Sequence, residues 1–141
     1  MTATLGVEVS KMPVRNAGDI ERSIDALALA SNSGLFVLPG SATVSQRELI
    51  VALAARHRLP AVYSQRYFAV SGGLASYGTD DLDLTRRAAS YADRILKGAK
   101  PADLPVVQAS KFELVINHQT ARMLGITVPP LLLTIADEVI E

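Results

Sequence analysis

The sequence contains no cysteine, which excludes disulfide bonds, thiolate metal ligands and a cysteine nucleophile. Tryptophan is absent as well, and the aromatic residues are four tyrosines and three phenylalanines. Basic and acidic residues are balanced at 14 each, so the chain lacks the net positive charge with which proteins bind nucleic acids. The composition therefore argues against a nucleic-acid partner.

Long apolar runs are missing too. No stretch approaches the roughly 20 apolar residues that a membrane-spanning helix needs. Residues 1–14 lack the basic and then apolar layout of a signal peptide, so the chain as written is not expected to be addressed for export. Its 141 residues, 49% of them hydrophobic, predict one globular domain with a substantial core.

The first half of the chain alternates between strand and helix patterns. Leu5, Val7 and Val9 follow the period of two that predicts a half-buried strand at residues 5–14. Two further strands are predicted from short apolar runs, and the first of these is expected to be covered on both faces. These runs lie at residues 34–39 and 59–64.

Helices are predicted between these strands. The first spans residues 16–32 and begins with Asn16 as its N-cap. The second spans residues 45–58 and begins with a capping box made by Ser45 and Glu48. Strands and helices that alternate through short connections predict an α/β fold, with helices on both faces of a parallel sheet.

The second half of the chain has a different rhythm. Residues 65–71 are interpreted as a longer connection to a fourth strand at 72–78, and residues 100–105 as a linker. The other predicted elements are, in order, a helix at 79–98, an extended segment at 106–117, a helix that Asn117 caps and Gly125 ends, and a last helix begun by Pro130.

Candidate ligand-binding residues follow the predicted strands, because ligands of open parallel sheets bind at the carboxyl ends of the strands. These loops are rich in hydroxyl groups, aromatic rings and glycine, which suits a polar organic ligand with a flat or apolar part. Small polar residues are also ordinary loop chemistry, so both interpretations stay open. The candidates are Gly40, Ser41, Tyr63, Ser64, Arg66, Ser76 and Tyr77.

Catalytic, nucleotide and metal sites have little support. The sequence has no G-x-S-x-G elbow and no phosphate-binding glycine motif. His57 and His118 lie at predicted helix ends, away from the serine-rich loops. Asp80, Asp81 and Asp83 fall in a first helical turn, where acidic residues favour the helix dipole. We therefore predict no enzyme activity, no metal and no cofactor.

Several segments together resemble a known family. "ALAARHRLPAVY", "GGLASYG", "RILKGAKPADLPV" and "KFELVIN" follow one another in this order. They are similar to the C-terminal half of ABC-transporter substrate-binding proteins of the TrpX-like group, and the likeness runs from about Val14 to Glu141. The resemblance implies a type I periplasmic-binding-protein fold, in which two α/β lobes joined by crossing strands close on a small molecule.

The resemblance also implies a division of the chain. Residues 1–64 look like the body of the second lobe, residues 65–117 like hinge strands with a crossing helix, and residues 118–141 like helices that rejoin the second lobe. The glycines around the strand at 72–78 would then bend the backbone at the hinge. These hinge glycines are Gly72, Gly73 and Gly78.

The implied function is solute binding for an ABC importer, with an amino-acid-like ligand stacked on Tyr63 or Tyr77 and a permease as partner. The full protein is expected to be periplasmic or extracellular, and this chain to be a domain-sized piece of it. Without the first lobe, an apolar stripe on the helix at 80–97 would be uncovered, which predicts a homodimer. The stripe contains Leu84, Ala88, Tyr91, Ala92 and Ile95.

Two other classes share this type of fold. A flavodoxin-like enzyme or receiver domain needs a phosphate loop or an acidic cluster after the first strand, where this chain has Met12, Pro13, Val14 and Arg15. A ligand-sensing domain of a regulator is the main alternative, and such a domain normally accompanies a DNA-binding segment.

Overall fold

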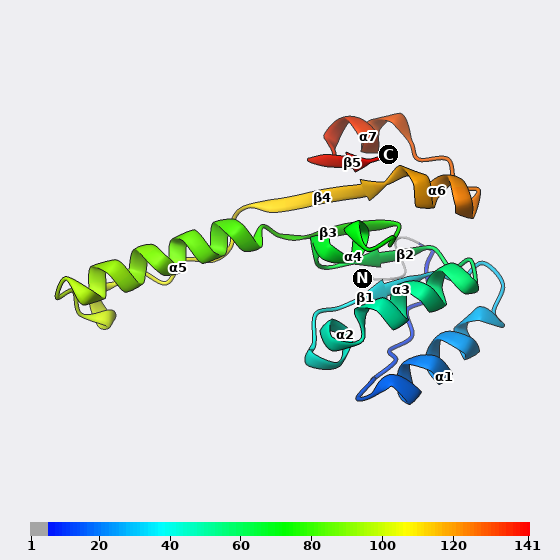
Figure 1. The fold of residues 1–141 in the computed structure, drawn as a ribbon, viewed down its shortest axis with the longest axis horizontal. Coiled ribbons are helices and arrows are strands. Elements are labelled where there is room, and N and C mark those ends of the chain that lie inside the picture. Colours follow the sequence, from blue (N-terminus) through cyan, green and yellow to red (C-terminus); the bar gives the residue numbers. More distant parts are fainter. Residues whose placement is uncertain (1–5) are drawn as a thin grey trace.

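A five-stranded sheet forms the centre of the computed structural model, which describes residues 6–141. The order across the sheet equals the order along the chain (Figure 1). The first three strands are parallel, the fourth is antiparallel to the third, and the fifth is parallel to the fourth. The strands are β1 (Leu35–Val37), β2 (Ala61–Tyr63), β3 (Ala75–Thr79), β4 (Phe112–Asn117) and β5 (Glu138–Ile140).

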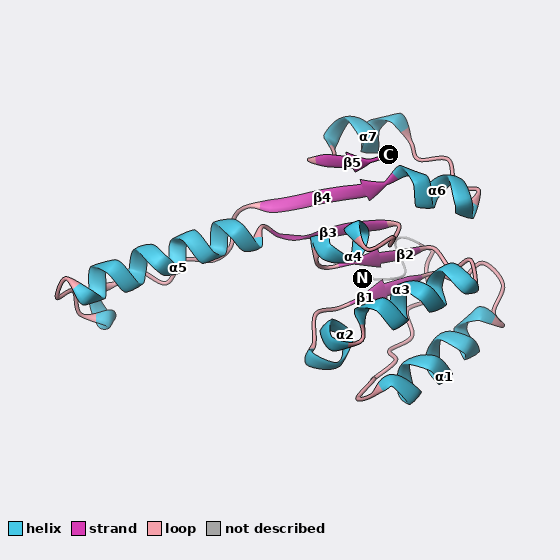
Figure 2. Ribbon diagram, viewed as in Figure 1, coloured by secondary structure: helices cyan, strands magenta, loops and turns pink. Residues whose placement is uncertain are grey.

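Helices connect these strands, and the predicted α/β class with a mostly parallel sheet is confirmed (Figure 2). One helix, α5, projects far from the rest of the molecule and none of its residues is buried (Figure 1). The helices are α1 (Ala17–Ala28), α2 (Ser41–Ser45), α3 (Arg47–Arg56), α4 (Arg66–Val70), α5 (Asp81–Leu96), α6 (His118–Leu124) and α7 (Pro130–Ile135), with a short 3₁₀ turn at Pro101–Asp103.

The predicted N-terminal strand is not present. Leu5 lies outside the described residues, and residues 6–14 form no strand. Val7 and Val9 have 57% and 64% of their surface exposed. Alternation shows only that a segment suits a pleated surface, and a strand also needs a neighbour that accepts its backbone hydrogen bonds.

The first helix follows the prediction. The side chain of Asn16 accepts a hydrogen bond from the backbone N–H of Asp19 at 2.9 Å, and the Asp19 carboxylate accepts one from the N–H of Arg15 at 3.0 Å. Ile20 and Ile24 are buried one turn apart on the inner face. The helix ends at Ala28, four residues before the predicted end.

The predicted capping box is wrong. The hydroxyl of Ser45 donates to the carbonyl of Ala42 and so belongs to the end of α2. Helix α3 begins at Arg47 after Gln46, whose side chain makes no capping hydrogen bond. A separate short helix after β1 was therefore missed, because the Ser-x-x-Glu pattern also fits a helix end followed by a new start.

Three further differences concern short elements. Residues predicted as a connection form α4, and the extended segment becomes a strand only from Phe112, since its partner β3 ends at Thr79. The C-terminal residues after α7 form β5, not more helix, because Val139 finds a free edge of the sheet opposite Ile116. Asn117 and Gly125 do cap and end α6 as predicted.

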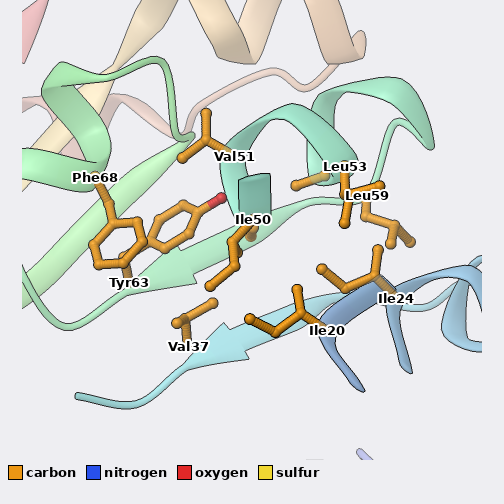
Figure 3. Packing of buried hydrophobic residues seen from close by; sticks show 11 residues of the cluster. Ile20, Ile24, Val37, Ile50, Val51, Leu53, Leu59, Tyr63 and Phe68 are labelled. Carbon is orange, nitrogen blue, oxygen red and sulfur yellow. The ribbon is translucent and has the colours of Figure 1, made fainter. Parts of the chain in front are cut away.

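The core lies on one face of the sheet, beneath α1, α3 and α4 (Figure 3). Tyr63 is fully buried, and its ring stacks on Phe68 of α4 with centroids 4.7 Å apart. The opposite face is more open: Phe36 of β1 is 60% exposed, so the expectation that this strand is covered on both faces is wrong. The largest core residues are Ile20, Ile24, Ile50, Val51, Leu53, Leu59, Tyr63 and Phe68.

Candidate ligand-binding site

The carboxyl ends of the three parallel strands meet at one side of the molecule, which we call the carboxyl edge (residues 38–41, 64–66 and 78–80). The backbones of Ser64 and Gly78 approach closely there. A Cβ atom at Gly78 would lie 1.8 Å from the carbonyl oxygen of Ser64. A residue with a side chain would therefore clash with the backbone of Ser64 at position 78. The role of Gly78 in a hinge stays a prediction.

Arg66 is the centre of a charged cluster at this edge. Its Nε and Nη2 atoms donate to Oε2 of Glu138 at 3.1 and 2.5 Å, and Nε lies 3.6 Å from Oε1 of Glu113. The hydrogen bond to the carboxylate of Glu138 raises the pKa of Arg66 further above its usual range. The three groups carry one positive and two negative charges, so the cluster has an excess of negative charge.

A second ion pair lies at the N-terminal end of the projecting helix α5. The ammonium group of Lys111 lies 2.6 Å from Oδ2 of Asp80, and Asp80 also caps α5 by accepting from the N–H groups of Leu82 and Asp83. The hydrogen bond from Lys111 lowers the pKa of Asp80, and the same bond raises the pKa of Lys111. The acidic first turn therefore serves the helix N-terminus, as predicted.

An exposed aromatic pair, formed by β3 and β4, lies near the carboxyl edge. The rings of Tyr77 and Phe112 stack with centroids 5.7 Å apart and an angle of 19° between their planes. Tyr77 and Phe112 are 55% and 47% exposed. Exposing apolar rings of this size to water is energetically unfavourable. The next residue along β4 is Glu113, which pairs with Gly78 and, because side chains alternate along a strand, points to the face opposite the rings.

Two of the predicted ligand residues point elsewhere. Tyr63 and Ser76 are 0% and 1% exposed and lie on the core face of the sheet, so neither is available to a ligand at the carboxyl edge. Burial raises the pKa of Tyr63 to about 12. The hydroxyl groups of Tyr63, Ser64 and Ser76 have no hydrogen-bond partner within the described part of the chain.

The glycine pair before β3 also belongs to the core. A Cβ atom at Gly73 would lie 2.5 Å from the ring of Tyr63 and 2.8 Å from the carbonyl oxygen of Phe68. Gly72 has a φ of 102°, which side-chain-bearing residues rarely adopt. The buried ring thus explains Gly73 and the positive φ explains Gly72, and a hinge at these positions stays a prediction.

Gly40 and Ser41 lie at the start of α2, at the carboxyl edge. Gly40 has an extended backbone and forms the N-cap without a side-chain hydrogen bond. The hydroxyl of Thr43 donates to the carbonyls of Leu38 and Gly40 and holds this turn. The turn leaves the first N–H groups of the helix open to an acceptor.

The histidines lie at helix ends, as expected. His57 ends α3, where its Nε2 is 2.7 Å from Oδ1 of Asp25, and His118 begins α6. Within residues 6–141 no group of three or more His, Cys, Asp or Glu side chains is placed to hold a metal ion. The same residues include no helix with the length and apolarity to cross a bilayer.

Sequence reasoning missed part of this edge. Phe112 and Glu113 of β4 and Glu138 of β5 lie beside the predicted residues, and none of them was a candidate. The β4 residues had a signal, since a strand that returns beside β3 must place its first residues opposite Gly78 and Thr79. Glu138 had none, because its segment was interpreted as helix.

The sequence and the fold of this chain are similar to those of known proteins. A model of the ABC transporter substrate binding protein family matches residues 1–140. The chain is 26% identical over 117 residues to a tyrosine-binding protein of Clostridioides difficile (strain R20291). The aligned region covers 83% of this chain and 34% of that protein. This chain therefore belongs to the ABC transporter substrate-binding protein family.

Solved structures are similar as well. An ABC domain from Streptococcus pneumonia in complex with L-Trp has 30% identity and a TM-score of 0.87, over 98% of this chain and 48% of that one. A conserved domain protein from Vibrio cholerae O1 biovar eltor str. N16961 has 27% identity and a TM-score of 0.86, over 98% and 46%. The chain thus spans about half the length of these structures and about a third of the tyrosine-binding protein.

Proposed function

We propose that this chain is one lobe of the solute-binding component of an ABC importer, and that its ligand is an amino acid or a close analogue. The role is binding, with no chemical step. Relatives that bind tyrosine or were solved with L-Trp support an aromatic amino acid as the first choice. A permease partner and a location outside the cytoplasm belong to the same proposal.

The observation that carries the proposal is the exposed aromatic pair at the carboxyl edge, with a negatively charged cluster on the other face of the same strands. Tyr77 and Phe112 offer ring faces on which an indole or phenol can stack. Glu113 follows Phe112 along β4 and therefore points to the other face of the sheet. There it shares Arg66 with Glu138, so the cluster holds more carboxylates than its one guanidinium neutralises. An ammonium group complements this excess charge.

The other predicted residues complete the proposal. The open N–H groups after Gly40 and Ser41 suit a carboxylate. Ser64 lies at the end of β2 between these loops. We retain Gly40, Ser41, Ser64, Arg66 and Tyr77 as ligand residues and add Phe112 and Glu113. Tyr63 and Ser76 are assigned to the core.

Amide NMR titration of the 141-residue chain tests the proposal. L-tryptophan and L-tyrosine are expected to give saturable shifts at Tyr77, Phe112 and Glu113, with weak affinity because a two-lobed cleft is not complete. Indole, which has the ring without the ammonium group, is expected to bind more weakly. Tyr77→Ala should weaken binding up to about tenfold, since ring stacking contributes about 0.5–1.5 kcal/mol beyond the buried area.

Phe36→Ala is the matched control, because Phe36 is an equally exposed ring on another strand of the sheet. Its affinity is expected to equal that of the unmodified chain. Shifts that stay linear with concentration, or an equal loss in both variants, would contradict the proposed site.

A further inference from the structure

A small cavity lies at the end of the sheet opposite the carboxyl edge. It has a volume of about 110 Å³, and its walls come from α3, α6 and the turn before β3. Ala61, which begins β2, and Leu74, which precedes β3, both line it. The amino ends of the parallel strands therefore face this cavity, and no residue of the carboxyl edge contributes to it.

The lining of the cavity is mostly apolar. Val51 and Leu59 form one side and Met123 and Leu124 the other, and Arg58 is the one charged residue among those that line it. Thr120 also lines the cavity, but its hydroxyl already donates to the carbonyl of Gly72 at 2.9 Å.

Tyr63 gives this apolar cavity an unsatisfied polar group. Its side chain is 0% exposed, it lines the cavity, and its hydroxyl has no partner within the described residues. Figure 3 shows the hydroxyl extending from the ring toward Val51, on the cavity wall. Buried hydroxyl groups in native proteins nearly always have a partner, so the missing partner points to an occupant of the cavity.

The surroundings of Tyr63 keep the hydroxyl in this position. Phe68 stacks on one face of the ring, and Gly73 packs against its edge so closely that a Cβ atom would lie 2.5 Å away. The ring therefore has no room to turn its hydroxyl toward another acceptor. Gly73 therefore helps to hold this phenol in place.

We propose that the cavity is a second binding site, which takes a small neutral molecule with an aliphatic body and one hydroxyl or carbonyl group that pairs with Tyr63. The size fits: an apolar cavity of ~150 Å³ holds benzene, and about 110 Å³ suits a molecule of four or five heavy atoms. The site is separate from the proposed amino-acid site and does not depend on it.

The test uses the 141-residue chain labelled at valine, leucine and methionine methyl groups, with 2-methyl-1-propanol as the probe. Saturable shifts are expected at Val51, Leu59 and Met123. Tyr63→Phe keeps the ring packing and removes the hydroxyl, so binding should weaken roughly five- to tenfold, as for the loss of one hydrogen bond.

A filled cavity provides the second arm. Ala55→Leu places a larger side chain at an exposed lining position of α3 and is expected to abolish the shifts. Ala52→Leu, on the same helix but outside the lining, is the matched control and should bind like the unmodified chain. Should Ala55→Leu fail to fold in a melting control, the Tyr63→Phe comparison still decides.

Two results would overturn the proposal. Shifts that rise linearly without saturation would mean that the cavity holds only water. Equal affinity in Tyr63→Phe would mean that the hydroxyl does not contact the occupant.

Discussion

Tyr63 buries a large apolar ring together with a hydroxyl group whose burial is unfavourable. Its ring is part of the core, yet its hydroxyl is buried without a partner in the described residues. A buried hydroxyl that lacks a hydrogen bond costs about 1–3 kcal/mol. The residue is therefore less favourable for stability than phenylalanine in the absence of an occupant, which makes its hydroxyl a functional feature of the fold.

Tyr63→Phe is expected to raise the free energy of unfolding at pH 7 by about 1 kcal/mol, because it removes the unpaired hydroxyl and keeps the ring. Urea unfolding measures this change. Tyr91→Phe is the control with the opposite sign, since the Tyr91 hydroxyl donates to the carbonyl of Pro105 at 2.6 Å and its loss removes a hydrogen bond. A lower stability for Tyr63→Phe would contradict the expectation.

The pKa of Tyr63 adds a pH dependence to the same comparison. An unfolded tyrosine ionises near pH 10 and folded Tyr63 near 12, because burial disfavours the phenolate. Its contribution is complete below pH 10 and is lost as the pH rises from 10 to about 12. The phenolate absorbance that appears near pH 12 should disappear in Tyr63→Phe.

Gly78 is the second residue whose identity is dictated by space. Gly78→Ala would place a methyl group 1.8 Å from the carbonyl oxygen of Ser64, which belongs to the backbone and cannot turn away as a side chain could. We expect a loss of about 3 kcal/mol or more, measured by urea unfolding. Gly40→Ala is the control: its Cβ would be 3.5 Å from the nearest atom, so the loss should stay below about 1 kcal/mol.

At the scale of elements, Asn117 joins three parts of the fold. Its side-chain oxygen accepts from the N–H of Thr120 and caps α6, and its amide donates to the carbonyl of Ala69 in α4 at 3.1 Å. Its own backbone N–H donates to the carbonyl of Leu74. One buried side chain thus ties the end of β4 to a helix that precedes it by almost fifty residues.

Asn117→Ala is expected to cost about 2 kcal/mol of unfolding free energy, because it removes a cap and a second, buried hydrogen bond to the carbonyl of Ala69. Asn117→Ser keeps a capping oxygen and should lose less. Asn16→Ala is the control for the loss of a cap alone, because Asn16 is exposed and its side chain accepts a hydrogen bond from the N–H of Asp19. A loss of about 1 kcal/mol of unfolding free energy is expected for this variant. Equal losses at the two asparagines would show that the bond to Ala69 contributes nothing.

Elements can be predicted from the sequence when the residues that determine them lie close together in the chain. Asn16, Asn117 and Gly125 act within one turn of the chain, and the helices that they begin or end were predicted correctly. β5 depends on an edge of β4 that is distant in sequence, and the strand expected at residues 5–14 depends on a partner that the described residues do not provide. Such causes leave no local pattern.

The candidate site divides in the same way. The strand-end rule found Arg66 and Tyr77, because it depends only on where strands stop. It also selected Tyr63 and Ser76, and the direction of a side chain at a strand end depends on register and pleat, which the sequence does not state. Glu138 reaches Arg66 only through the pairing of β4 with β5.

At the scale of the whole molecule, α5 is the feature without a partner. Its 16 residues project from the body with none buried, and Leu84 and Ile95 are 37% and 40% exposed. The helix begins with Asp81 and Asp83 and ends with Arg94 and Lys97. Two copies in antiparallel contact would cover both apolar stripes and place the acidic end of each helix beside the basic end of the other.

We therefore expect the 141-residue chain to form a dimer, which analytical ultracentrifugation measures. Ile95→Glu should yield monomers, because it places a charge within the apolar contact. Ser90→Glu, also on α5 and exposed but outside the stripe, should remain dimeric. A single monomeric species for the unmodified chain would contradict the expected pairing.

The strands that carry α5 lie side by side in the sheet. Thr79, where the chain leaves the body, pairs directly with Phe112, where it returns. Opposite residues of an antiparallel pair are close enough to be joined by a two-residue turn. The segment 80–111 is thus a detachable insertion: a shortened gene with Asn-Gly in its place would encode a β-hairpin, and the body with its core and cavity would become a self-contained miniature of the lobe.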